Sequence, residues 1–194
     1  MSNRALMLFA AAGVLAASLR AQAPPEPTVY AVTTEYRATG TVVRTTYRQG
    51  SKVRVDAGDA GNLSAKPTRT LYDLQTLQRL SWIPSDASRS CTRAAFTPGA
   101  WQDPFEGGSD LAMKDVKQTG TDIVHGVPTV ILESDKKPGF RLWVDPKTGL
   151  MSKAEFTAKE LGAKITYFEV TNVSFAPLPP STFDVPSSCA LTMK

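Results

Sequence analysis

The sequence predicts a mainly β protein, in which a long antiparallel meander forms an unclosed (half) β-barrel with one or two short helices or loops covering its concave face. From residue 121 to 186, segments rich in β-branched and aromatic residues, such as Phe140–Val144, alternate with tight turns. The turns contain Gly or Pro, as at His125–Pro128 and Lys136–Gly139, because these residues favour chain reversal. Such short connections make neighbouring strands antiparallel, and a run of about ten strands is near the size at which an open sheet curls.

The N-terminal half continues the same pattern. Apolar and polar residues alternate, which indicates a sheet with one face turned to water. Leu80 and Trp82 fall on the same side of their segment, and residues 56–66 are expected to form a loop. The strands expected in this half cover residues 30–38, 41–48, 52–56, 70–73 and 78–83.

Residues 84–117 are the least regular part of the chain, and we expect them to cover the concave face. Within them, Ser109 and Asp110 precede Leu111–Lys114, which is the pattern of a short helix with an N-terminal cap. This is the one helix that the sequence indicates clearly after the N-terminal segment.

The first 23 residues have the pattern of a secretory signal peptide. Arg4 precedes an apolar run over Ala5–Leu19, and Ala21–Ala23 forms a small-x-small cleavage site. The run is shorter than the roughly 20 residues of a membrane-spanning helix, so cleavage after Ala23 is the favoured interpretation. We therefore expect a periplasmic or secreted protein. Its expected parts are a signal peptide (1–23), a linker (24–28), a single domain (29–186) and a C-terminal tail (187–194).

The charge distribution and the two cysteines bear on a nucleic-acid partner and on a disulfide. The formal charge is +4, but without Arg4 and Arg20 the balance is 20 basic to 18 acidic residues, with no clustered basic run. A nucleic-acid partner is therefore not expected. Cys91 and Cys189 would meet an oxidising compartment after export, which favours a disulfide, although two unpaired thiols remain the alternative.

The sequence shows no recognisable set of catalytic or metal-binding residues. His125 is the only histidine and lies in a turn pattern, which argues against both a catalytic triad and a zinc site. Asp145, Glu155 and Glu169 lie on or beside alternating strands, where a polar face is expected anyway. We expect no enzyme activity, no cofactor and no metal.

The aromatic residues of the strands allow two interpretations. They either fill an ordinary core or line an apolar pocket, and lipid-holding barrels use the same residue types for both purposes. The set comprises Trp82, Phe140, Trp143, Phe156, Tyr167 and Phe168.

Several motifs resemble the periplasmic outer-membrane lipoprotein-carrier (LolA/LolB-like) superfamily. These are Arg141–Leu150, in which a strand ends in W-x-D before a turn ending in T-G, then Lys153–Glu155, and the Gly turn and long strand of Gly162–Val173. The hairpin Gly120–Leu132 and the closing Phe183–Pro186 also fit. The resemblance implies an unclosed barrel that holds acyl chains of lipoproteins or related lipids.

The function expected from the sequence is therefore that of an exported, non-catalytic carrier that binds lipid or lipoprotein acyl chains. An envelope protein donor or acceptor would be its second partner. The alternative is a protein-interaction module of the cell envelope with a filled core and no ligand. Because a one-residue slip in register exchanges the two faces of a strand, the face that lines the cavity stays open. The candidate lining residues are Val130, Leu132, Leu142, Val144, Phe156 and Phe168.

Overall fold

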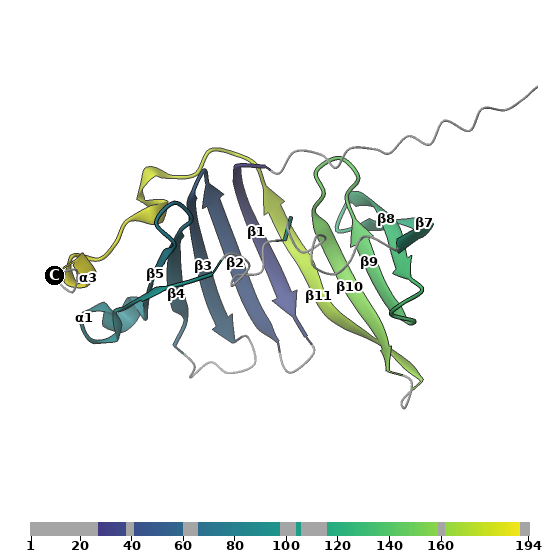
Figure 1. Ribbon diagram of the computed structural model, residues 1–194, viewed down its shortest axis with the longest axis horizontal. Coiled ribbons are helices and arrows are strands. Elements are labelled where there is room, and N and C mark those ends of the chain that lie inside the picture. Colours follow the sequence, from purple (N-terminus) through teal and green to yellow (C-terminus); the bar gives the residue numbers. More distant parts are fainter. Residues whose placement is uncertain are drawn as a thin grey trace, which may run out of the picture.

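The computed structural model describes residues 27–37, 41–59, 66–97, 104–105, 116–158 and 162–190. These residues form one antiparallel sheet with four short helical segments (Figure 1). The strands are β1 (Val29–Tyr36), β2 (Val42–Gln49), β3 (Lys52–Asp59), β4 (Thr68–Asp73), β5 (Gln78–Trp82), β6 (Thr92–Ala95), β7 (Val116–Val124), β8 (Val127–Ser134), β9 (Phe140–Val144), β10 (Met151–Ala158) and β11 (Ala163–Ser174). The helical segments are η1 (Pro84–Asp86), α1 (Ala87–Ser90), η3 (Pro180–Phe183) and α3 (Ser187–Ala190).

The sheet has eleven strands in the order β6-β5-β4-β3-β2-β1-β11-β10-β9-β8-β7. The first and last strands of the chain, β1 and β11, pair at its centre, and β6 and β7 form the two edges. The sheet is not closed into a barrel, because β6 and β7 do not pair with each other. The expected mainly β, unclosed antiparallel architecture is therefore confirmed.

Local turn chemistry sets the hairpins. The β7–β8 hairpin turns on two residues, His125 and Gly126, whose φ angles are 45° and 80°. Two successive positive φ angles define the turn that matches the twist of a two-residue hairpin, and glycine adopts such angles without strain. The turn that the sequence predicts at this position is confirmed.

The two faces of the sheet differ in chemistry. Directly paired residues of antiparallel strands share a face, so the register extends each alternation across the whole sheet. The face that carries Tyr30 and Val32 on β1 also carries Val53 on β3 and Leu142 on β9, and we call it the apolar face. The opposite face carries charged side chains of β3 and β10 and, at its β4–β5 end, a second apolar cluster.

The C-terminal segment 177–190, which we call the strap, packs on this opposite face. In Figure 1 it runs from the end of β11 past β1, β2 and β3 and ends beside α1. Val185 packs with Leu80 and Trp82, and Cys189 forms a disulfide with Cys91 at the end of α1. The disulfide expected from the two cysteines is confirmed. Leu80 and Trp82 lie on the same side of the sheet, as the sequence predicts.

An ion-pair network on the opposite face lies beside the strap. The carboxylate of Asp56 accepts hydrogen bonds from Arg54 Nε at 2.8 Å and Arg69 Nε at 3.0 Å. Arg54 Nη1 also donates to the Thr182 carbonyl oxygen at 2.8 Å, which joins β3 to the strap. Burial by itself raises the pKa of Asp56, but the hydrogen bonds from the two guanidinium groups outweigh it and hold that pKa below its ordinary value.

Two of the expected local features differ in the structure. β3 continues to Asp59, so the expected loop at 56–66 begins later than its small and acidic residues suggest. Residues 84–95 are not irregular, because they form η1, α1 and the edge strand β6. The helix expected at 109–114 lies outside the described residues. Within the described ranges, no helix is long and apolar enough to cross a bilayer.

Candidate apolar binding site

Buried apolar side chains gather on the apolar face of β9, β10 and β11. Leu142, Val144, Met151, Ala154 and Phe168 form this group, which we call the apolar cluster. Leu142 keeps 2% of its surface exposed and Ala154 keeps none. Leu142 pairs with Ala154, which pairs with Phe168, so the register alone brings three strands together at this point.

The structure brings five of the six expected lining residues together. Leu142, Val144 and Phe168 belong to the apolar cluster, and the half-buried Val130 and Leu132 of β8 pack against it. Phe156 lies on the same face, opposite Phe140 of β9, but outside the buried group. The register thus places all six on one face, which the sequence left open.

Met151 and Ala154 are members of the cluster that the sequence did not indicate. They are three residues apart, so strict alternation would place them on opposite faces of β10. The pairing of β10 with β9 shifts register between Met151 and Lys153, which leaves Ser152 as an extra residue in the strand. Composition carries no mark of this shift, since no Gly or Pro occurs there.

An open hollow of about 500 Å³ adjoins the cluster at Val130. Ile123 lies at its side and keeps 69% of its surface exposed. Pro128 and Pro146 add apolar surface, so the hollow extends the apolar face toward the tip of the β7–β8 hairpin. Its lining residues are Thr121, Asp122, Ile123, Pro128, Thr129, Val130 and Pro146.

The cover expected from residues 84–117 is described only in part. Phe105 packs on Tyr30 of the apolar face, with ring centroids 4.6 Å apart, and Met151 N–H donates to the Pro104 carbonyl oxygen at 3.0 Å. Phe96 also packs on this face, against Val53. Residues 84–95, which were also expected to cover this face, do not do so: Ala87 of α1 packs with Leu80 and Trp82 on the opposite face, and β6 extends the sheet beside β5.

Tyr36 and Arg44 add polar groups at the border of the apolar face. Tyr36 packs against the apolar cluster, and the Arg44 guanidinium lies over its ring at 4.8 Å from the centroid. Burial raises the pKa of Tyr36, and the neighbouring Arg44 charge opposes that rise. The Tyr36 phenol therefore stays protonated near neutral pH.

The carboxylates considered in the sequence have separate partners. Asp145 Oδ2 accepts a hydrogen bond from Thr148 Oγ1 at 2.6 Å within its own turn. Glu155 pairs with Lys153 at 2.6 Å, and Glu169 Oε1 lies 3.1 Å from His125 Nε2. Asp145 and Glu155 therefore support contacts within their own turn or strand, whereas Glu169 ties β11 to the tip of the β7–β8 hairpin.

Trp143 belongs to the opposite face, unlike its neighbours Leu142 and Val144. Its indole Nε1–H donates to Asp122 Oδ2 at 3.0 Å, and Lys153 Nζ lies 4.8 Å from the centroid of its ring. Hydrogen bonds from the Ile123 backbone N–H and then from Trp143 lower the pKa of Asp122. This aromatic residue links β9 to β7 and does not line the apolar hollow.

No protein-family model matches this chain, and no curated protein matches it. Several solved structures, in contrast, are similar to this chain. The crystal structure of MucB is similar at 19% sequence identity and a TM-score of 0.53, over 84% of this chain and 58% of that chain. The MucA/MucB complex of Pseudomonas aeruginosa matches at 16% identity and a TM-score of 0.52, over 83% of this chain and 56% of that chain.

An uncharacterized conserved protein from Thermus thermophilus has a TM-score of 0.53 at 12% identity, over 83% of this chain and 87% of that chain. This chain therefore spans little more than half the length of the MucB chains but most of the Thermus protein. At these identities the likeness shows a shared fold.

Proposed function

We propose that this chain is an exported, non-catalytic binding protein whose apolar face holds acyl chains of a lipid or lipoprotein. The observation that carries the proposal is the open hollow beside Ile123 and Val130, which adjoins the apolar cluster through Val130. Each methylene group buried there contributes about 0.8 kcal/mol. The Cys91–Cys189 disulfide supports export to an oxidising compartment such as the periplasm.

A test of this proposal compares the bound lipid before and after extraction. Native mass spectrometry of the protein purified from bacterial envelopes should show a mass excess that organic extraction removes. The extracted protein should then bind a fluorescent fatty acid with saturation. Absence of both the mass excess and the uptake would refute the carrier proposal.

A matched pair of variants locates the binding site. Ile123→Asp places a charge in the hollow and should weaken fatty-acid binding about tenfold or more, because the carboxylate has to be desolvated when the acyl chain enters. Leu77→Asp changes another exposed apolar residue, in the β4–β5 turn far along the sheet, and should leave binding unchanged. Equal effects of the two changes would contradict the proposed location.

A protein partner is the second candidate function. MucB, which shares the fold, has been solved in complex with MucA. In the present chain, the nine-residue edge strand β7 pairs on one side only among the described residues, and it contains no proline. An extended segment of another protein can add to such an edge. Capture of an envelope protein by extracted, lipid-free protein, with no fatty-acid binding, would favour this function.

A further inference from the structure

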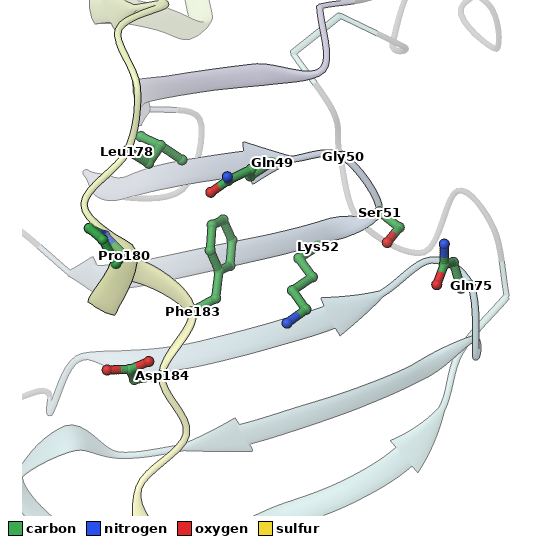
Figure 2. Close-up of a pocket in the computed structure, with 9 residues that line it drawn as sticks. All are labelled: Gln49, Gly50, Ser51, Lys52, Gln75, Leu178, Pro180, Phe183 and Asp184. Atoms are coloured by element: carbon green, nitrogen blue, oxygen red, sulfur yellow. The ribbon is translucent and has the colours of Figure 1, made fainter.

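A second hollow, of about 670 Å³, lies on the opposite face of the sheet, between the strap and the turns of the strands beneath it (Figure 2). This volume falls in the range of about 300–1,000 Å³ typical of small-molecule sites. The acyl-chain proposal makes no use of it, because the apolar cluster lies on the other face. Its lining residues are Gln49, Gly50, Ser51, Lys52, Gln75, Leu178, Pro180, Phe183 and Asp184.

An aromatic ring stands in the middle of this strap hollow. Figure 2 shows the Phe183 ring between the side chains of Gln49 and Lys52, above β2 and β3, with Leu178 and Pro180 beside it. Phe183 is half buried, so part of its surface remains open to a ligand. An aromatic surface of this kind offers a large apolar area on which the C–H groups of a ligand ring can pack.

The polar groups around Phe183 suit a neutral ligand that both donates and accepts hydrogen bonds. Gln49 and Gln75 each carry an amide with two donors and an acceptor. Lys52 and Asp184 have opposite charges, so the lining carries no net charge from these two residues. A strongly anionic or cationic ligand would meet one repulsive charge, whereas a polyhydroxylated ring beside Phe183 would find partners at Gln49 and Lys52 (Figure 2).

The walls of the strap hollow are held in place before any ligand binds. Arg54 Nη1 donates to the Thr182 carbonyl oxygen at 2.8 Å, and Asp184 N–H donates to the Ser181 carbonyl oxygen at 3.2 Å. Across the hollow, Leu74 N–H donates to the Ser51 carbonyl oxygen at 2.8 Å and joins the two strand turns. Fixed walls reduce the entropy that binding would otherwise lose.

We propose that the strap hollow binds a saccharide unit of a glycan, with the sugar ring stacked on Phe183 and its hydroxyl groups bonded to the neighbouring Gln49 and Lys52 (Figure 2). The ligand class follows from the combination of one open aromatic surface with amides and balanced charges. An extended peptide fits less well, because the Gly50 N–H already donates to the Thr28 carbonyl oxygen, and the carbonyl oxygens of Gly50 and Ser51 already accept from Arg48 and Leu74.

Nuclear magnetic resonance of the disulfide-intact protein, titrated with N,N′-diacetylchitobiose and separately with maltose, tests this inference. The side-chain NH₂ resonances of Gln49 should shift with saturation for at least one sugar, with a Kd near 1 mM, about −4 kcal/mol. No shift with either sugar up to about 50 mM, well above that Kd, would overturn the proposal. Shifts confined to residues of the apolar face, such as Ile123 and Val130, would overturn it as well.

Two aromatic variants complete the test. Phe183→Ala should weaken sugar binding at least tenfold, while Phe175→Ala, which removes a 45% exposed ring outside the hollow, should leave it unchanged. If Phe183→Ala binds the sugar as tightly as the wild type does, the stacking role is refuted. If that variant does not fold, the amide shifts of the wild type alone decide whether the sugar binds in the strap hollow. Saturable shifts with an extended peptide, and none with sugars, would replace the saccharide by a peptide. Fatty-acid binding at Ile123 is measured separately, so either proposal can fail alone.

Discussion

Removal of the Cys91–Cys189 disulfide should cost a large part of the folding stability. The bond joins residues 98 positions apart, so it closes the part of the chain that contains β6 to β11 into one covalent loop. In the chain-entropy model, a loop of about 100 residues contributes about 4.7 kcal/mol, because it restricts the unfolded chain. Cys189 is fully buried beside Leu80 and Trp82, so the disulfide also holds the strap against the sheet.

The double variant Cys91→Ala/Cys189→Ala should therefore unfold with a free energy lower by about 4–5 kcal/mol than the wild type, out of the roughly 5–15 kcal/mol of an ordinary domain. Urea denaturation followed by tryptophan fluorescence measures this difference. The m value should rise in the variant, because its unfolded chain is less restricted and exposes more surface.

Reduction supplies the control. Wild-type protein in a reducing agent should behave like the double variant, and the variant itself should not respond to the agent. A loss of less than about 2 kcal/mol would show that the unfolded chain gains little freedom, and the loop argument would then be refuted.

Two further changes test the packing and the charges of the sheet. Leu142→Ala, in the apolar cluster, should lower the free energy of unfolding by about 2–5 kcal/mol. Arg141→Ala, at the next position on the opposite face, should change it by about 0.5 kcal/mol or less. Equal losses in chemical denaturation would contradict the assigned faces. Asp56→Asn removes a carboxylate whose pKa is lower in the folded protein than in the unfolded chain. The ionised carboxylate should therefore raise the free energy of unfolding of the wild type above about pH 4, and this contribution should disappear as the pH falls through the lowered pKa. The two proteins should differ by about 2 kcal/mol at pH 7, and this difference should shrink as the pH falls below about 4; a constant difference from pH 7 downward would show that the ionised form is not the stabilising one.

Local chemistry accounts for the parts of the fold that were predictable. The His125–Gly126 turn and the hairpin of β4 and β5 lie where turn residues separate alternating segments, and both depend on contacts only a few residues apart. The common side of Leu80 and Trp82 follows from the two-residue period of a strand. These features need no knowledge of the rest of the molecule.

The missed features depend on distant contacts. Strand β6 consists of four mostly exposed residues, and its backbone pairing with β5 carries no hydrophobic signal. Helix α1 has four residues, and it is held next to α3 and tied there by the disulfide of Cys91. Propensity for such short elements is weak, so packing decides them.

The candidate sites divide along the same line. Val130, Leu132, Leu142, Val144, Phe156 and Phe168 were named from apolar alternation, and the structure places them all on one face. The strap hollow around Phe183 was not predicted, because its walls come from residues 49–52, 75 and 178–184. No spacing in the chain reports that these segments meet.

By itself, the sequence determined the strand and turn pattern, the antiparallel pairing of neighbours and the two cysteines available for a disulfide, because each depends on residue type and short-range geometry. Tertiary structure alone decided which face is apolar, where β10 shifts register at Ser152, and that the strap closes a hollow over β2 and β3. Those outcomes depend on the pairing of β1 with β11 and on packing between residues more than 100 positions apart, which no local pattern encodes.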